Sequence, residues 1–388
     1  MDALATPLNW QRVRLGDIGK PCMCKRVMKH QTTRYGEIPF YKIGTFGNTA
    51  DAFISKKLFL EYKTKYSFPK KGDILISASG TIGRAVIYDG KPAYFQDSNI
   101  VWIDNDETLV KNDFLFYAYS NVKWNTEHTT ILRLYNDNFR NTLIPLPPLN
   151  EQIAIANILS DLDRYLYNLD ALILKKESVK KALSFELLSQ RKRLKGFNQA
   201  WQRVRLGDIG KPCMCKRVMK HQTTRYGEIP FYKIGTFGNT ADAFISKKLF
   251  LEYKTKYSFP KKGDILISAS GTIGRAVIYD GKPAYFQDSN IVWIDNDETL
   301  VKNDFLFYAY SNVKWNTEHT TILRLYNDNF RNTLIPLPPL NEQIAIANIL
   351  SDLDSEIISL KNKKRQFDNI KKALNHDLMS AKIRVLKK

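Results

Sequence analysis

The chain has 388 residues, and 44% of them are hydrophobic, as in a typical globular protein. Its net charge of +20 favours a polyanionic partner such as nucleic acid, although a basic solvated surface has the same composition. Neither an apolar run of about 18 residues nor a signal peptide is found, so we expect no membrane span and a cytoplasmic location.

The sequence contains a long internal repeat. The segment that begins at Trp10 begins again at Trp201, and the two copies are identical over residues 10–163 and 201–354. Solenoid repeats run about 20–50 residues, whereas a unit of this length is the size of a domain with its own core. Because surface positions tolerate change, identity at all of them indicates recent duplication, recombination or engineering.

Each copy begins with a module that is predicted to be mixed α/β and rich in strands. Runs of β-branched and aromatic residues predict strands at 40–43, 73–77, 84–88 and 100–103. Each run is bounded by Gly, Pro, Asn or Asp. A short helix is expected at 112–120, and the proline-rich stretch 143–149 is expected to be extended.

The four cysteines form one Cys-x-Cys pair in each copy. Cys22 and Cys24 form this motif in the first copy, and Cys213 and Cys215 form it in the second. This spacing is too short for a Cys-x-x-Cys zinc site, and no second pair of Cys or His residues completes it. We therefore expect reduced thiols and no metal site.

Beyond each module, apolar residues recur at alternating steps of four and three, which predicts a coiled coil. The expected core positions are Leu159, Leu162, Leu166, Leu169, Ile173, Leu350, Leu353, Ile357, Leu360 and Phe367. Lysines occupy further positions of the same series, namely Lys176, Lys180, Lys364 and Lys371. Two such helices in one chain pair most simply with each other. The alternative is that each helix docks on a partner protein.

The expected fold class is therefore α+β. Two mixed α/β, strand-rich domains are separated by two long helices that form an antiparallel coiled coil, and the equal halves favour a pseudo-two-fold arrangement. The expected boundaries are residues 1–149 for the first module, 150–196 for the first helix, 197–340 for the second module and 341–388 for the second helix.

Polar loops with basic, aromatic and amide side chains separate the predicted strands, at 24–31, 77–84 and 94–99. Arg and Lys bind guanine edges or phosphates, and amides pair with adenine, so these loops favour sequence-specific DNA binding. Ordinary polar loops have the same composition, which is the alternative. The predicted DNA-contacting residues are Lys25, Arg26, Lys29, Lys42, Ser79, Thr81, Arg84, Tyr94, Gln96 and Ser98, with their copies Lys216, Arg217, Lys220, Lys233, Ser270, Thr272, Arg275, Tyr285, Gln287 and Ser289.

Three longer motifs recur in both copies. They are Phe-Pro-Lys-Lys-Gly-Asp-Ile-Leu-Ile-Ser at 68–77 with Gly-Thr-Ile-Gly at 80–83, Ile-Pro-Leu-Pro-Pro-Leu-Asn-Glu-Gln-Ile-Ala at 144–154, and Trp10 with Leu-Gly-Asp-Ile at 15–18. In combination they resemble the specificity subunits (HsdS) of type I restriction–modification systems, over nearly the whole chain.

This resemblance implies a non-catalytic subunit with two target recognition domains. Its two long helices would bind two adenine-N6 methyltransferase subunits, and the assembly can recruit a restriction and translocation subunit. No cofactor is then expected in this chain, because S-adenosylmethionine belongs to the methyltransferase, and ATP and magnesium belong to the restriction subunit. The family usually carries two different recognition domains, so two identical ones predict a palindromic, bipartite DNA target with an unread gap.

Two other functions are compatible with parts of the sequence. The Asn/Asp-Pro-Pro-Tyr/Phe motif of adenine methyltransferases is absent, but Asp51 followed by Glu61 and Lys63 matches the magnesium site of many restriction nucleases. Such a pattern also arises often by chance. A scaffold that assembles a complex without reading DNA would leave the polar loops without a role.

Overall fold

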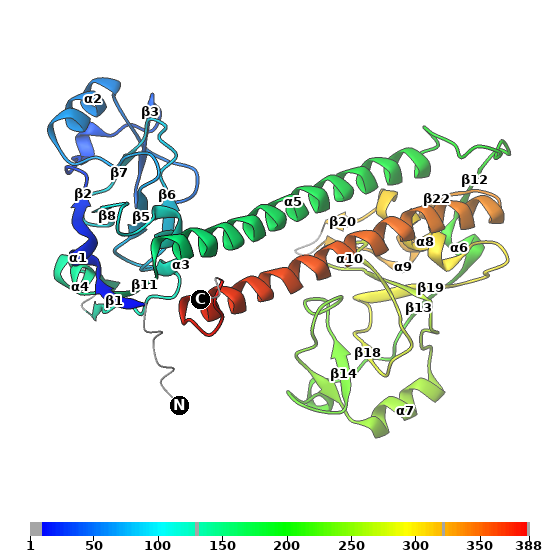
Figure 1. Ribbon diagram of the computed structural model, residues 1–388. Coiled ribbons are helices and arrows are strands. Elements are labelled where there is room, and N and C mark those ends of the chain that lie inside the picture. The colour runs from blue at the N-terminus through cyan, green and yellow to red at the C-terminus, as the bar shows by residue number, and fades with distance from the viewer. Residues whose placement is uncertain (1–9, 129–131, 320–322, 386–388) are drawn as a thin grey trace. The chain divides into compact units, whose positions relative to one another are not determined.

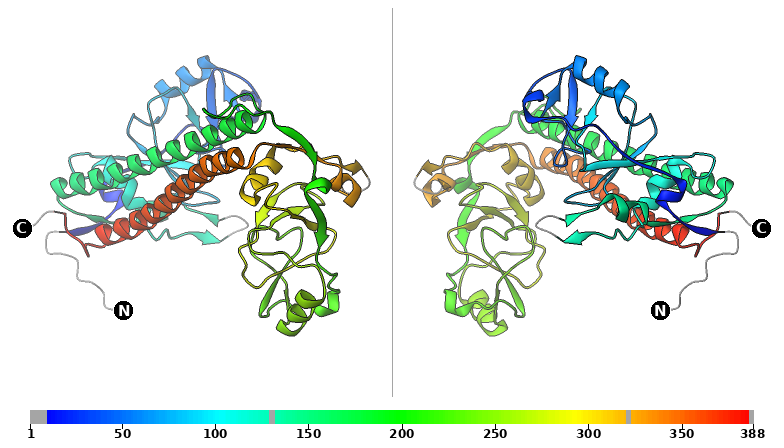
Figure 2. Two further views of the ribbon diagram at one scale, coloured as in Figure 1. Left: turned by 90° about the vertical axis from the view of Figure 1, so that its right-hand side faces the viewer. Right: turned by 90° about the vertical axis from the view of Figure 1, so that its left-hand side faces the viewer.

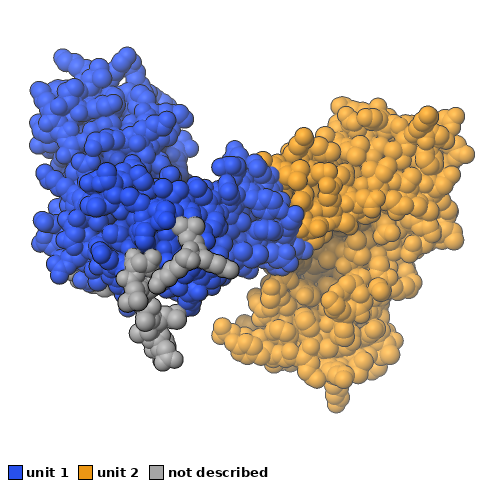
Figure 3. Space-filling view, viewed as in Figure 1, with its two compact units in different colours: residues 1–170, 362–388 blue, residues 171–361 orange. Residues whose placement is uncertain are grey.

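The computed structural model describes residues 10–128, 132–319 and 323–385. The chain divides into two compact units, residues 1–170 with 362–388 and residues 171–361, which are coloured separately in Figure 3. Each unit combines one module with parts of two long helices. Within the described residues, no helix has the length and apolar character needed to cross a membrane.

Within the described residues, the first module contains short strands, short helices and one 3-10 helix. In chain order these are β1 (Gln11–Arg14), α1 (Leu15–Ile18), β2 (Gly19–Met23), η1 (Lys29–Gln31), β3 (Ile38–Tyr41), β4 (Phe53–Ile54), α2 (Lys56–Lys65), β5 (Ile74–Ser77), β6 (Ala85–Ile87), β7 (Tyr94–Phe95), β8 (Ile100–Asn105), α3 (Asn112–Tyr119), β9 (Glu127–His128), β10 (Leu132–Arg133), α4 (Asn136–Arg140) and β11 (Leu143–Leu146).

A four-stranded antiparallel sheet with the order β2-β8-β5-β6 forms the centre of this module (Figure 1). Alternate residues of its central strands point into two different cores, as the period of two in a strand requires. Ile74 and Ile76 pack in the core that contains α3 and the start of α5 (Leu149–Leu188), whereas Leu75 packs with Trp102 in the core that contains Phe59 of α2. Burial on both faces explains why β5 and β8 are continuous apolar runs.

A smaller sheet with the order β4-β3-β7 covers the second core. Strand β3 pairs with β7 in parallel and with β4 in the antiparallel sense. Helix α2 begins where the Ser55 hydroxyl accepts a hydrogen bond from the Leu58 N–H at 3.2 Å, an N-cap that satisfies one of the free N–H groups of the helix end. Two further pairs, β1 with β11 and β9 with β10, complete the module.

The second module repeats these elements and pairings. Its elements are β12 (Gln202–Arg205), α6 (Leu206–Ile209), β13 (Gly210–Met214), η2 (Lys220–Gln222), β14 (Ile229–Tyr232), β15 (Phe244–Ile245), α7 (Lys247–Lys256), β16 (Ile265–Ser268), β17 (Ala276–Ile278), β18 (Tyr285–Phe286), β19 (Ile291–Asn296), α8 (Asn303–Ala309), η3 (Tyr310–Asn312), β20 (Glu318–His319), β21 (Leu323–Arg324), α9 (Asn327–Arg331) and β22 (Leu334–Leu337). The predicted mixed α/β, strand-rich character is confirmed for both modules.

Two long helices, α5 (Leu149–Leu188) and α10 (Leu340–Met379), have 40 residues each. In the first unit they run antiparallel, since Asp163 pairs with Lys371 and Asp170 with Lys364. The views of Figure 2 show α5 in green beside α10 in orange and red. Ile155 and Leu159 of α5 share a core with Leu378 of α10.

The second unit repeats this antiparallel pairing with the roles of the helices exchanged. Lys180 and Lys176 of α5 pair with Asp354 and Glu356 of α10, the second pair at 2.8 Å. The predicted antiparallel coiled coil is thereby confirmed within each unit. The four lysines of the predicted series all pair with an acid of the opposing helix, which explains why charged residues occupy core positions.

The predicted coiled-coil core positions are buried or half-buried. Leu159, Leu166, Leu169, Ile173, Leu350 and Ile357 are buried, and Leu162, Leu353, Leu360 and Phe367 are half-buried. Phe367 packs its ring against Tyr165 at a centroid distance of 4.7 Å.

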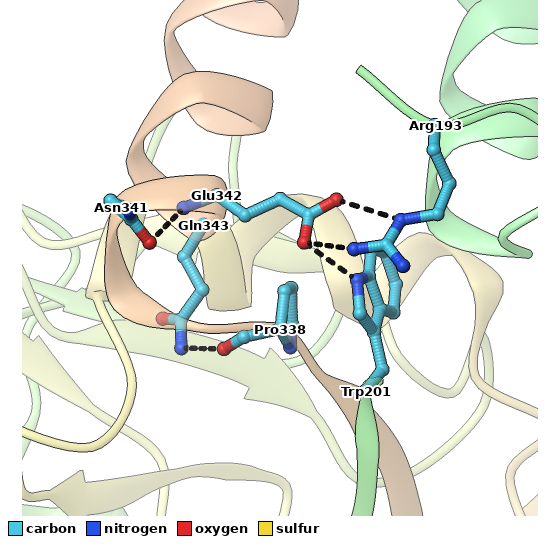
Figure 4. Close-up of polar contacts among 6 residues, drawn as sticks. All are labelled: Arg193, Trp201, Pro338, Asn341, Glu342 and Gln343. Atoms are coloured by element: carbon cyan, nitrogen blue, oxygen red, sulfur yellow. Dashed lines mark hydrogen bonds and ion pairs between the residues drawn. The ribbon is translucent and has the colours of Figure 1, made fainter. Parts of the chain in front are cut away.

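A buried glutamate joins the start of each long helix to the module that precedes it, and Figure 4 shows the one in the second unit. In the second unit, Glu342 accepts a hydrogen bond from the Trp201 indole N–H at 2.9 Å. Both of its oxygens also pair with the Arg193 guanidinium, at 3.2 and 2.7 Å. Because the Glu342 side chain is only 1% exposed, its charge requires these partners.

The first unit builds the same arrangement from a different part of the chain. Glu151 binds Trp10 at 3.0 Å and Arg384, which lies close to the C-terminus. Arg193 and Arg384 lie outside the identical segments but keep the register of the repeat.

The cysteines are free thiols that take part in packing. Cys24 is 2% exposed in the core of the smaller sheet, and burial raises the pKa of its thiol to about 12. Cys22 is half-buried, and its pKa is raised mainly by burial and by the nearby charge of Asp104.

Candidate nucleic-acid interface

Five of the ten predicted contact residues of the first module line one polar pocket of about 570 Å³. They are Arg26, Lys29, Lys42, Gln96 and Ser98. Arg26 and Lys29 lie on the segment around η1, Lys42 follows β3, and Gln96 and Ser98 lie on the turn between β7 and β8. The fold therefore brings two of the three predicted loops together.

The turn at 96–99 is anchored to the end of β3. The Gln96 N–H donates to the Tyr41 carbonyl at 2.9 Å, and the Gln96 side-chain oxygen accepts from the Ile43 N–H at 3.0 Å. The Ala78 N–H donates to the Asn99 carbonyl at 2.7 Å, which ties the turn to the loop after β5. Gln96 thus positions the pocket wall, and its amide NH₂, which donates to no described residue, is available to a ligand.

The pocket has a strongly positive lining. Arg26, Lys29, Lys42 and Arg133 contribute four cationic side chains, against one carboxylate from Asp97. Lys42 pairs with Asp51 outside the lining at 2.8 Å, whereas no ion pair includes Arg26, Lys29 or Arg133 in the part of the chain that the structure describes. Unpaired cations at a concave surface attract phosphate and guanine edges.

The loop after β5 is held by hydrogen bonds of its own. The Ser77 hydroxyl accepts from the Arg84 N–H at 2.9 Å and donates to the Thr81 carbonyl. Arg84 donates from its guanidinium to the Phe46 carbonyl at 2.9 Å, so this side chain holds the loop and is only partly available to DNA. Thr81 is exposed, but neither it nor Arg84 lines the pocket.

Two predicted contact residues are buried. Tyr94 is 0% exposed, its hydroxyl donates to the Lys25 carbonyl at 3.0 Å, and burial raises its pKa. Ser79 is 5% exposed and forms a backbone bridge with Arg133. We therefore remove the side chains of Tyr94 and Ser79, with Tyr285 and Ser270, from the candidate set. Lys25 remains exposed, with its ammonium 5.2 Å from the centre of the Tyr66 ring.

The second module places the copied residues in the same contacts. Gln287 accepts from the Ile234 N–H at 3.1 Å, and Arg275 donates to the Phe237 carbonyl at 3.0 Å. The remaining copies, Lys216, Arg217, Lys220, Lys233, Thr272 and Ser289, have the exposure classes of their counterparts.

Four polar residues of the lining are not among the predicted contact residues, namely Thr32, Asp97, Asn99 and Arg133. Asp97 and Asn99 lie in a loop that the sequence singled out, so loop membership was the available signal. Arg133 reaches the pocket because β10 is bridged to Ser79, a contact between distant segments that no local pattern reveals.

The comparison with protein families decides the identity of the chain. A family model of the type I restriction modification DNA specificity domain matches twice, at residues 7–176 and 198–367. The chain belongs to this family. It is a type I restriction–modification specificity subunit, as its motifs predicted.

Individual relatives of this specificity subunit agree with the family. The chain is 44% identical to a putative type I restriction enzyme specificity subunit of Haemophilus influenzae, over 67% of the chain and 69% of that protein. It is 28% identical to the type I restriction enzyme MjaVIII specificity subunit of Methanocaldococcus jannaschii, over 99% and 95% of the two chains. The crystal structure of a type I S subunit from M. genitalium has the same fold, with a TM-score of 0.60, 18% identity and 97% coverage of both chains.

The nuclease pattern does not form a site in this specificity subunit. Asp51 pairs with Lys42, and Glu61 pairs with Lys65 on the surface of α2 at 3.0 Å. Among the described residues, no group of three or more His, Cys, Asp and Glu side chains could hold a metal ion. The alternative of a built-in nuclease therefore has no structural support.

Proposed function

We propose that each module reads one half-site of double-stranded DNA through its basic pocket, and that the target is a palindromic, bipartite sequence with an unread gap. The observation that carries this proposal is the lining of the pocket in the first module. Its cations Arg26, Lys29 and Arg133 form no ion pair with any residue that the structure describes, and they lie beside the side chains of Gln96 and Ser98. Cations of this kind bind phosphates or guanine, and amides and hydroxyls read other base edges.

The palindromic character follows from identity between the modules. Two domains of one sequence prefer one half-site sequence, and domains related by a two-fold axis meet that sequence in opposite orientations. The antiparallel helices would then act as a spacer that fixes the length of the gap.

The proposed domains are residues 1–149 and 197–340 as target recognition domains, with 150–196 and 341–388 as the helical segments. On the helices we expect two methyltransferase subunits, and on the complete assembly a restriction subunit. The chain itself is proposed to be non-catalytic and cytoplasmic. S-adenosylmethionine, ATP and magnesium would be cofactors of its partners.

Co-expression with the cognate methyltransferase subunit, followed by genome-wide mapping of methylated adenines, tests this function. The expected motif has two identical half-sites in inverted orientation and a fixed gap. An asymmetric motif would contradict equivalent use of the modules. If the complex assembles but methylates no adenine, the chain is a scaffold that does not read DNA. Magnesium-dependent cutting of DNA by the purified chain would instead support the nuclease alternative.

A further inference from the structure

Asp97 is an acidic residue in a pocket that is otherwise lined by cations. Its side chain is half-buried and lines the pocket with Arg26, Lys29 and Arg133. Within the described residues its carboxylate forms no ion pair, and its one side-chain hydrogen bond comes from the neighbouring Ser98 hydroxyl at 3.4 Å. Asp51, by contrast, is paired with Lys42 at 2.8 Å.

Neither the fold nor phosphate binding explains this carboxylate. The backbone of Asp97 closes the turn, because the Asn99 N–H donates to the Asp97 carbonyl at 2.7 Å, and the side chain takes no part in that bond. A negative charge inside the pocket repels phosphates and so weakens sequence-independent affinity. A carboxylate offers hydrogen-bond acceptors alone, so its suitable ligand is a donor group.

The turn that carries Asp97 is held in a strained and fixed conformation. Ser98 has a φ of 58°, in the left-handed region where glycine is favoured, and Ser289 has the same value. The turn is tied down on both sides, since Gln96 binds the end of β3 and the Asn99 carbonyl accepts from Ala78. A strained, well-anchored turn at a pocket is typical of positions where side-chain direction matters for a ligand.

We propose that Asp97, and Asp288 in the second module, are specificity-determining residues that accept a hydrogen bond from the exocyclic amino group of a base. In the major groove, cytosine N4 and adenine N6 are the amino groups that a carboxylate can read, whereas guanine and thymine present acceptors there. This inference rests on the proposed function, because it requires that the pocket face the bases. The neighbouring cations would hold the phosphates while Asp97 selects the base.

The identical modules provide an internal control for the test. In the single variant Asp97→Asn, the first module gains an amide donor in place of one carboxylate oxygen, while Asp288 keeps the second module unchanged. The variant is co-expressed with the methyltransferase subunit, and methylated adenines are mapped. Asp89→Asn is the matched control, because it removes the same charge from an exposed turn outside the pocket.

The expected result is a motif in which one base pair of one half-site changes or becomes relaxed, while the other half-site stays as in the wild type. Loss of one good base contact corresponds to about a 5- to 150-fold change in preference at that position. The base pair that changes tells whether cytosine or adenine supplies the amino group. The double variant Asp97→Asn with Asp288→Asn should alter both half-sites equally.

An unchanged motif in both variants, from complexes that assemble and melt like the wild type, would overturn the proposal. So would tighter binding to all DNA without a change of motif, because Asp97 would then act only by repelling phosphates. These failures leave the proposed function intact. Failure of the wild-type complex to methylate any motif is instead a failure of the proposed function itself.

Discussion

Glu151 and Arg384 form a bidentate ion pair, with N···O distances of 2.6 and 2.8 Å, between the start of α5 and the segment that follows α10. Glu151 also accepts from Trp10 at 3.0 Å, so one carboxylate joins three segments of the first unit. Glu342 does the same in the second unit with Arg193 and Trp201.

The first prediction concerns this carboxylate. Glu151→Gln replaces one carboxylate oxygen, which accepts hydrogen bonds, by an NH₂ group that only donates, and the Glu151 side chain is only 3% exposed. We expect the first unit to lose about 2–4 kcal/mol of unfolding free energy, because the guanidinium keeps no anionic partner there. Urea unfolding of the full chain, with fluorescence probes in each unit, measures the effect.

The twin variant Glu342→Gln is the matched comparison, since it makes the same change in the second unit. Each variant should shift the transition of its own unit. If neither transition moves, the buried carboxylates contribute nothing measurable to the stability of the units.

The second prediction tests the register of the coiled coil. Asp163 of α5 pairs with Lys371 of α10 and accepts from the Tyr117 hydroxyl at 2.8 Å. Asp163→Lys should destabilise the first unit, because two lysines then face each other. The exchange Asp163→Lys with Lys371→Asp should recover part of the loss, with a coupling energy of about 0.5–3 kcal/mol in a double-mutant cycle. Additive effects of the two changes would mean that the residues are not in contact.

The third prediction concerns the buried thiols. Burial raises the pKa of Cys24, and of Cys215 in the second module, to about 12. Above pH 9 the unfolded chain releases these protons while the folded chain retains them, so the stability that depends on the neutral thiols falls as the pH rises. The free energy of unfolding should fall by about 1.4 kcal/mol per pH unit for each thiol in this range.

Comparison of wild type with the double variant Cys24→Ala and Cys215→Ala between pH 8 and 10.5 isolates this effect, because the other titrating groups are common to both proteins. The wild type should lose stability faster. Parallel pH profiles would show that the thiols are accessible to water in the folded protein.

All four predicted strands overlap strands of the structure, since 40–43 overlaps β3 and 84–88 contains β6. The other two are buried on both faces. The stretch predicted at 73–77 appears as β5, and the one at 100–103 appears within β8, because burial on two sides requires continuous apolar sequence. Strand β2 contains Pro21 and polar residues, and strand β7 has two residues, so neither has a pattern that periodicity detects. Their pairing depends on partners that are distant in sequence.

The candidate site was predictable as a set of loops but not residue by residue. Tyr94 was predicted as an aromatic contact residue because a polar loop follows it at 96–99, yet tertiary packing buries it with Trp102. Asp97 lies in the predicted loop at 94–99 but is not among the predicted contact residues, and its place among cations is visible only after the chain folds. Arg193 and Arg384 kept the register of the repeat outside the identical segments, which was the available signal for the buried ion pairs.

The last prediction separates phosphate binding from base reading. Lys29 is exposed and unpaired among the described residues, and its flexible ammonium suits phosphate contact. Lys29→Gln with Lys220→Gln should weaken binding to all DNA sequences alike and leave the methylated motif unchanged. The slope of log affinity against log salt concentration should fall by about 1 for each phosphate contact that is lost.

The matched control is Lys57→Gln with Lys248→Gln, which removes the same charges from exposed positions on α2 and α7, outside the pocket. Both pairs lower the net charge equally, so general attraction to DNA falls equally in the two proteins. A larger loss of salt dependence for the Lys29 pair therefore reports direct phosphate contact. Equal slopes would place the phosphates elsewhere on the module, and a changed motif would assign Lys29 to a base.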